Sequence, residues 1–142
     1  MTIRAILQTK SGEILSIGGD AVVTEAIALL AERRIGALPV IEDGQVCGIF
    51  SERDVVYGIA REGAAFLSRK VAEVTITPPI TASIDESAIG ALSLMTLRRI
   101  RHLPVMDGEQ HVGFISIGDL VKYRIDRIEA EAAALRDYIQ GS

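Results

Sequence analysis

The sequence predicts an α+β fold, layered like an α/β sandwich, in which two similar units are related by a pseudo-twofold axis. Two observations predict this fold. The chain repeats itself at a spacing of 65 residues, and each repeat reads as a helix, two short apolar strands and a second helix. A further apolar pattern near the end adds a long C-terminal helix. We therefore expect unit 1 at residues 1–70, unit 2 at 71–125 and a helical extension at 126–142, with a small sheet and two packed helices in each unit.

Composition limits what this fold can do. The chain has 142 residues, 49% of them hydrophobic, which suits a globular protein with a buried core. Cys47 is the only cysteine, so no disulfide can form within the chain, and we expect a cytoplasmic location. The sequence shows no secretory signal and no apolar run long enough to span a membrane. A net charge of −4 disfavours a broad nucleic-acid surface. We expect neither a membrane nor a nucleic acid as partner.

The repeat is clearest around the strands. Residues 33–56 align without gaps with residues 98–121, and 11 of these 24 positions are identical. The shared positions include "RRI", "LPV" and a Gly, Ser and Asp further along. Each unit lies near the lower size limit for independent folding. We therefore expect the two units to pack face to face.

Each element of a unit follows from a local pattern. Apolar residues at helical spacing run from Ala26 to Ile35, and their counterparts from Ala91 to Ile100. The strands are "ALPVI" and "VCGIF" in unit 1, where Asp43-Gly44 indicates a tight turn, and "HLPVM" and "VGFIS" in unit 2. The closing helices are "RDVVYGIARE" and "GDLVKYRIDRIEAEAAALRDYI". An extended segment, "GEILSI" or "PPITAS", precedes each unit's first helix.

One seven-residue motif ends the second strand of both units. It reads "GIFSERD" at 48–54 and "GFISIGD" at 113–119. One interpretation is a capping box, in which Ser and Asp satisfy free backbone groups at a helix start. The other is a ligand site, because a helix N-terminus attracts anions and a carboxylate accepts hydrogen bonds from the paired hydroxyls of a ribose. The strand glycine indicates close approach by another backbone or a ligand. On the motif alone, both interpretations stay open.

The duplicated combination of an "LPV" strand, a turn and this motif resembles a tandem pair of CBS domains, known as a Bateman module. The resemblance covers about residues 3–125. It implies a regulatory module, not an enzyme, that binds AMP, ATP or NAD in the cleft between the units. It further implies that the acid of each motif holds ribose hydroxyls and that the serine meets phosphate; these residues are Asp54 and Ser51 in unit 1, and Asp119 and Ser116 in unit 2.

The resemblance also implies cationic phosphate contacts, which differ between the units. The residue before the motif's acid is Arg53 in unit 1 and glycine in unit 2. The pair before "LPV" is Arg101-His102 in unit 2 and Gly-Ala in unit 1. We therefore expect the Asp119 pocket to be the better equipped. The preceding extended segments are expected to line the base, with Ile80 and Thr75 in unit 2, and Lys10 and Leu15 in unit 1.

The C-terminal helix carries an apolar seam. Its members alternate at spacings of four and three residues, as in a coiled coil: Val121, Ile125, Ile128, Ala132, Leu135 and Ile139. Because the seam spans under three heptads, packing on its own domain is an alternative. We expect contact with a partner helix, most simply in a homodimer.

These observations predict a nucleotide sensor whose ligand changes the packing that an unidentified downstream protein reads. The alternative is a dimeric interaction scaffold that keeps the fold and binds no nucleotide. An enzyme comes third: no Ser-His-Asp arrangement can be placed around the motif serines, and Cys47 has Val112 as its repeat counterpart, which indicates a buried strand position. We expect no catalytic cofactor and, since two histidines and one cysteine have no ligand spacing, no metal.

Overall fold

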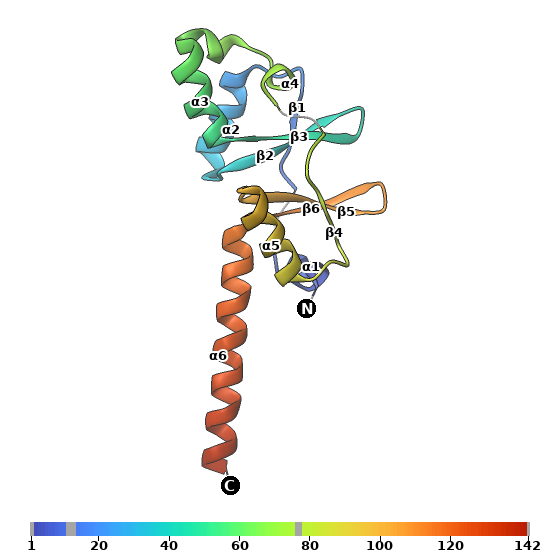
Figure 1. The fold of residues 1–142 in the computed structure, drawn as a ribbon, viewed down its shortest axis with the longest axis vertical. Coiled ribbons are helices and arrows are strands. Elements are labelled where there is room, and N and C mark those ends of the chain that lie inside the picture. The colour runs from blue at the N-terminus through green and yellow to red at the C-terminus, as the bar shows by residue number, and fades with distance from the viewer. Residues whose placement is uncertain (1, 11–13, 76–77, 142) are drawn as a thin grey trace.

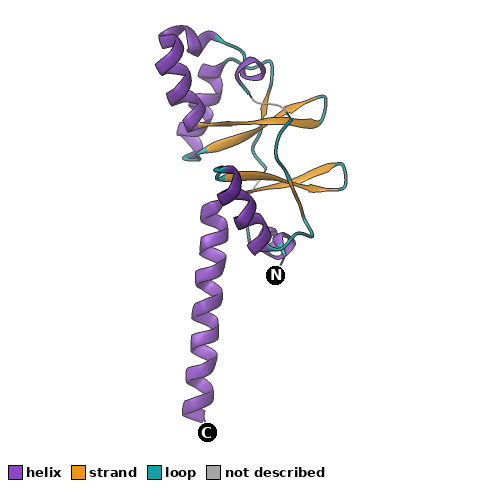
Figure 2. Cartoon of the chain, in the orientation of Figure 1, coloured by secondary structure: helices purple, strands orange, loops and turns teal. Residues whose placement is uncertain are grey.

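The computed structural model describes residues 2–10, 14–75 and 78–141. Figures 1 and 2 show two small sheets, one above the other, with helices on their outer sides and one long helix projecting away. Unit 1 contains β1 (Ile17–Gly18), α2 (Val23–Arg33), β2 (Ala37–Glu42), β3 (Gln45–Ser51), α3 (Glu52–Glu62), the 3-10 helix η1 (Gly63–Ser68) and α4 (Val71–Val74). Unit 2 contains β4 (Ala82–Ser83), α5 (Ala88–Arg98), β5 (His102–Asp107), β6 (Gln110–Ser116) and the long α6 (Ile117–Gly141). A short helix, α1 (Ile3–Thr9), comes first. The predicted fold class is confirmed.

The two sheets have the same topology and the same register. In each, a short strand runs parallel to the middle strand, which pairs antiparallel with the third. Ala37 lies opposite Ser51, and 65 residues later His102 lies opposite Ser116. The turn at Asp43 and Gly44 has positive φ at both residues (51° and 76°), as a tight hairpin turn requires.

Both first helices end in a left-handed arginine. α2 stops at Arg34 (φ 53°) and α5 stops at Arg99 (φ 55°). This conformation is uncommon for a residue with a Cβ and costs about 1 kcal/mol or more, so it is found where the surroundings enforce it. In each unit the left-handed residue ends the helix, and three residues later the middle strand begins.

Each unit has its own core, and the two cores match position by position. The first contains Leu38 and Val40, and the second contains Leu103 and Val105 at the same repeat positions, all fully buried. The β3 and β6 strands are in contact, so the sheets face each other between the two cores.

The helix preceding each unit packs on the other unit. Although α1 lies within the 1–70 segment expected to form unit 1, Ile3 and Ile6 are buried in the core of unit 2. The Ile3 N–H donates to the Glu86 carbonyl at 2.9 Å. Val71 of α4, 65 residues after Ile6, is buried in the core of unit 1. The expected division at residue 70 is thus corrected for α1, because the apolar side of this helix is covered by unit 2.

Within the described residues, no helix combines the length and the apolar character that a bilayer span needs.

Candidate functional site

A cavity of about 620 Å³ lies between the two units. Its size falls in the range of small-molecule sites. Unit 1 contributes the end of α2 and the start of β2, and unit 2 contributes β5, β6 and the first turn of α6. Leu7 of α1, Lys10, Ile14 and Leu15 line one side. Among the described residues, the polar side chains of the lining are Lys10, Arg34, His102, Ser116 and Asp119.

The motif of each unit caps the helix that follows it. The Ser116 N–H donates to Asp119 Oδ2 at 2.9 Å, and the Asp119 N–H donates to Ser116 Oγ at 3.1 Å. In unit 1 the corresponding bonds between Ser51 and Asp54 are 2.9 and 3.4 Å long. The capping interpretation is confirmed in both units, and it leaves the ligand interpretation open.

Both serines contact the acid of their own motif. Ser51 Oγ donates to Asp54 Oδ2 at 3.0 Å. The side chain of Ser116 also hydrogen bonds to Asp119, and this bond contributes to the lowered pKa of that acid. Asp119 further accepts a hydrogen bond from Lys10 on Oδ2.

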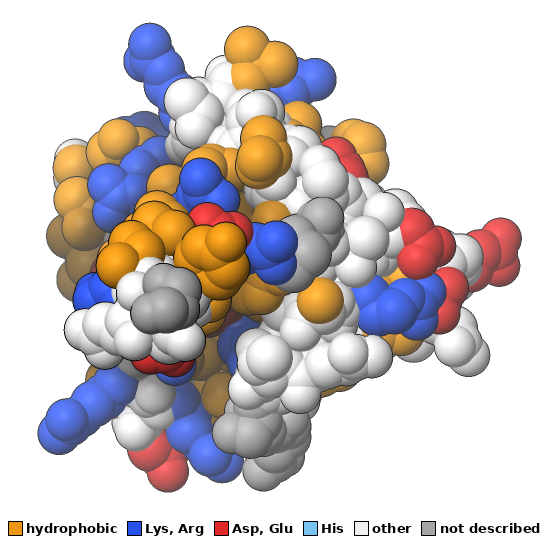
Figure 3. All heavy atoms as spheres, turned by 90° about the horizontal axis from the view of Figure 1, so that it is seen from below, with side chains coloured by type: hydrophobic (Ala, Val, Ile, Leu, Met, Phe, Trp, Pro, Cys, Tyr) orange, Lys and Arg blue, Asp and Glu red, His pale blue; other side chains and the backbone are white. Residues whose placement is uncertain are grey.

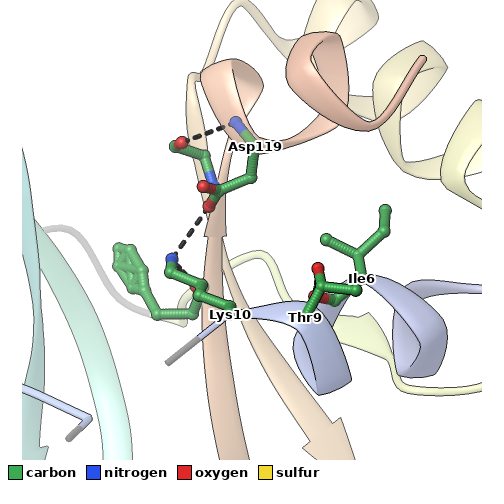
Figure 4. Close-up of polar contacts among 6 residues, drawn as sticks. Ile6, Thr9, Lys10 and Asp119 are labelled. Atoms are coloured by element: carbon green, nitrogen blue, oxygen red, sulfur yellow. Dashed lines mark hydrogen bonds and ion pairs between the residues drawn. The ribbon is translucent and has the colours of Figure 1, made fainter. Parts of the chain in front are cut away.

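Lys10 reaches the second motif from the end of α1 (Figure 4). Its Nζ donates to Asp119 Oδ2 at 2.8 Å and to the Phe114 carbonyl at 2.7 Å. Burial alone would raise the pKa of Asp119, but the hydrogen bonds from Lys10 and Ser116 and the charge of Lys10 outweigh it and lower that pKa. The expected place of Lys10 in the Asp54 half is therefore corrected: α1 packs on unit 2, so the lysine that follows it lies beside Asp119.

His102 lies at the boundary between the two units. Its ring meets the edge of Phe114 with centroids 5.6 Å apart, and a Cβ on Gly36 of unit 1 would lie 3.5 Å from it. Burial lowers the pKa of His102 below its usual 6.5, against the opposing charge of Asp119. The ring is consequently neutral at pH 7 and can donate one hydrogen bond and accept another.

Arg34, not Arg101, is the arginine of this cavity. Arg34 lines it from unit 1, whereas Arg101 is exposed and does not belong to the lining. The pseudo-twofold packing places the loop before β2 of one unit against the motif of the other. The sequence-based prediction combined residues of the same unit into each site and therefore missed Arg34. This arginine belongs to the "RRI" stretch that both repeats share.

Of the remaining predicted site residues, Leu15 lies in this cavity. It was expected with Lys10 in the Asp54 half, and like Lys10 it lies in the Asp119 half, whereas Ser51, Arg53 and Asp54 do not line the cavity. Arg53 Nη1 donates to the carbonyl of Arg99, the repeat counterpart of Arg34, at 3.1 Å. Thr75 Oγ1 donates to the Val71 carbonyl at 2.6 Å, and Ile80 packs against the second core.

The close approach expected at the motif glycine comes from a side chain. A Cβ on Gly113 would lie 2.8 Å from the methyl carbons of Leu7, which itself lines the cavity. Gly113 thus leaves room for α1 to pack on the sheet.

Comparison with known proteins gives the family of the chain. A family model described as CBS domain matches residues 3–61 and, a second time, residues 71–126. The chain belongs to the CBS-domain family. The resemblance carried by the duplicated motif is confirmed, and each of the two matched segments contains one of the two sheets.

Other proteins with CBS domains are similar along most of the chain. The CBS domain-containing protein CBSX3, mitochondrial, of Arabidopsis thaliana is 32% identical over 149 residues, which cover 99% of this chain and 72% of the relative. The crystal structure of the CBS-domain containing protein ATU1752 from Agrobacterium tumefaciens is 35% identical with a TM-score of 0.82, covering 87% of this chain and 92% of that one. A more distant structure, CBSX2 in complex with AMP, shares the fold at 20% identity with a TM-score of 0.73, covering 88% and 96% of the two chains.

The two histidines of the second CBS domain should make stability depend on pH. Burial lowers the pKa of both His102 and His111 below 6.5. The unfolded chain therefore binds protons more readily than the folded one, and the free energy of unfolding should fall as the pH drops from about 6.5 through the folded pKa values. Urea unfolding at pH 7.5 and 5.5 measures this loss.

Single variants separate the two contributions. His102→Gln and His111→Gln should each remove part of the pH dependence, and the double variant should be the flattest between pH 5.5 and 7.5. Asp119 has a lowered pKa and loses its contribution at lower pH, below its usual value of 3.8, so it does not interfere in this window. If the free energy of unfolding of the double variant depended on pH as strongly as that of the unaltered protein, the pH dependence would not come from these two histidines.

Proposed function

We propose that this chain is a regulatory module that binds an adenosine nucleotide, of the AMP, ATP or NAD type, in the cleft between its two CBS domains. The observation that carries the proposal is the position of Asp119, a helix-capping acid in a cavity that also holds cations from both sides of the cleft. The AMP complex of the related fold CBSX2 supports it.

The ribose would be held by Asp119. Within the described residues, the hydrogen bonds to this carboxylate all end on Oδ2, from Ser116 and Lys10. Oδ1 is left for a sugar hydroxyl, and a charged acceptor makes such a bond stronger than a neutral one. Displacement of Lys10 Nζ, which lies 2.8 Å from Oδ2, would open that oxygen to the second hydroxyl.

The phosphate would be held by Ser116, Arg34 and Lys10. Among the described lining residues, Lys10 and Arg34 bring two positive charges into the cavity, Asp119 brings one negative charge, and His102 is neutral at pH 7. This excess of positive charge suits a phosphate, and an arginine can bind it in two-pronged fashion. Leu7, Ile14, Leu15 and Phe114 supply apolar surface for the base.

The motif of the first domain would form a second, weaker half-site. Asp54, Ser51 and Arg53 would face Arg99, the repeat counterpart of Arg34, across the pseudo-twofold axis, as Asp119 and Ser116 share their cavity with Arg34. Arg101, the counterpart of Gly36, would lie beside it. Thr75 and Ile80, at the repeat positions of Lys10 and Leu15, would complete it. Thr75 carries no positive charge where the second motif has Lys10, so this half-site offers less to a phosphate. It would take the second part of a dinucleotide or stay empty.

The signal would be a change in packing. A ligand that touches both Arg34 and Asp119 spans the two domains, and Asp119 lies in the first turn of α6. Such a ligand favours the domain arrangement that it binds more tightly, by the difference of its affinities. We propose that the chain acts as a homodimer and that an unidentified downstream protein reads this arrangement. A cytoplasmic location stays a prediction, and the Arabidopsis relative is described as mitochondrial.

Thermal melting tests the proposal. Two or three charge-assisted hydrogen bonds at about 1.5–3 kcal/mol each, less the cost of association, leave a dissociation constant of about a micromolar. AMP, ADP, ATP, NAD, NADH and S-adenosylmethionine are added separately, and a binding nucleotide at a hundredfold excess over its constant should stabilise the protein by about 2.7 kcal/mol. No shift with any of them would favour the dimeric scaffold that binds no nucleotide. Turnover of an added nucleotide would instead indicate an enzyme.

A further inference from the structure

The last helix leaves its apolar seam uncovered. α6 projects from the second CBS domain (Figure 1), and Val121, Ile125, Ile128 and Leu135 are each 46–59% exposed. The body of the domain contacts the opposite side of the helix, where Leu120 is buried and Tyr123 packs against the core. Figure 3, which looks along α6 from its free end, shows hydrophobic side chains beside that end with charged ones on either side. The seam is thus open from its first residue onward.

Charged residues flank the seam in a defined order. With Ile125 and Ala132 at the a positions and Ile128 and Leu135 at the d positions of a heptad, the flanking g positions hold Arg124 and Glu131. The flanking e positions hold Lys122, Glu129 and Arg136. Such residues meet across the seam of a two-stranded coiled coil and decide which orientation it adopts.

The two orientations differ in every charged pair. In a parallel pair of identical helices, each g residue meets the e residue five positions later in the other helix. Arg124 then meets Glu129, and Glu131 meets Arg136, so all these contacts are attractive. In the antiparallel register that aligns the whole seam, like charges meet: Lys122 with Arg136, and Glu129 and Glu131 each with its own copy.

We propose that α6 pairs in parallel with α6 of a second copy of this chain. The proposal rests on the homodimer of the proposed function and specifies its contact and orientation. The rest of the second CBS domain leaves the seam uncovered because it packs against the side of α6 that carries the f position Tyr123. Glu131 also interacts with Arg127 of its own helix, with Nε 3.6 Å from Oε1, a contact that the parallel partner's Arg136 would share. A parallel pair places both nucleotide cavities at the same end of the dimer.

Disulfide cross-linking tests the orientation in the full chain. In a Cys47→Val background, Ile128→Cys at a d position should form a disulfide-linked dimer on mild oxidation, because residue 128 meets its own copy in the parallel pair and residue 132 in the antiparallel one. Ala130→Cys, at an outward f position half a turn away, is the matched control and should stay uncross-linked. An antiparallel pair would instead link Ile128→Cys to Ala132→Cys in a mixture of the two variants, and that result would overturn the proposal.

A charge exchange tests the contacts without cysteines. Glu129→Lys and Arg124→Glu should each weaken the dimer about tenfold in sedimentation equilibrium, because each symmetric dimer turns two attractive pairs into repulsive ones. The double variant should regain the affinity of the unaltered chain. In the antiparallel register residue 124 meets Tyr138 and residue 129 meets its own copy, so no such recovery would occur.

Two further results would overturn the proposal. One is a chain that stays monomeric at 0.1 mM, and the other is a dimer that persists in the Ile128→Asp variant. Either result would mean that the seam contributes no binding energy to the dimer. Nucleotide melting shifts are measured on the same samples. A shift in a monomeric sample would leave nucleotide binding standing while this proposal fails, and a parallel dimer without any shift would do the reverse.

Discussion

Replacing Asp119 with alanine is expected to weaken nucleotide binding about a hundredfold. The carboxylate would accept two hydrogen bonds from ribose hydroxyls, and charged hydrogen bonds contribute about 1.5–3 kcal/mol each. At a nucleotide concentration one hundred times the original dissociation constant, the stabilisation should fall from about 2.7 to about 0.4 kcal/mol. Thermal melting with and without the nucleotide that binds the unaltered protein measures the loss.

Asp54→Ala is the matched control for this variant. Both acids cap a helix through the same pair of bonds with a serine, so each substitution should remove a cap that contributes about 1 kcal/mol in the absence of ligand, and Asp119→Ala also removes the ion pair with Lys10. Only Asp119 lines the 620 Å³ cavity, so Asp54→Ala should keep most of the ligand-induced shift. Equal losses of that shift in the two variants would refute the ranking of the two half-sites.

The repeat in the sequence predicted the units, and it could not predict which unit each helix covers. The 65-residue spacing correctly aligned the hairpins, the helices and the capping motifs, because these contacts are local or lie within one unit. The helix α1 was not predicted at all: seven residues with two buried side chains are too few to give a clear periodicity. Its packing on the second domain is a contact between residues 3–6 and residues 84–86, which no local pattern reveals.

The residues of the site were likewise predicted only where they lie within one domain. Ser116, Asp119 and His102 were found because motif and register place them in one domain. Lys10 was named but placed in the wrong half, and Arg34 was missed, because both reach Asp119 across the boundary between the domains. Applying the pseudo-twofold axis to the aligned repeats would have found them, since Arg34 corresponds to Arg99, whose carbonyl lies 3.1 Å from the side chain of Arg53 in the other motif.

Ile6→Ala is expected to destabilise the protein strongly. Ile6 is 3% exposed and belongs to the core of the second domain, where truncation of an isoleucine costs about 2–5 kcal/mol. For a chain of 142 residues this corresponds to a fall in melting temperature of about 10 °C. The nucleotide-induced shift should also shrink, because α1 carries Leu7 into the cavity and holds Lys10 beside Asp119.

Ile14→Ala separates these two effects. Ile14 lines the same cavity but is 47% exposed, so its truncation should cost less than about 1 kcal/mol of stability and act mainly on ligand binding. Hydrogen exchange gives an independent readout: in Ile6→Ala the amides of α1 should lose protection before those of β5 and β6, because the helix is attached chiefly through Ile3 and Ile6. If Ile6→Ala were as stable as Ile14→Ala, α1 would not be anchored in the second domain, and the place of Lys10 in the ligand site would lose its structural basis.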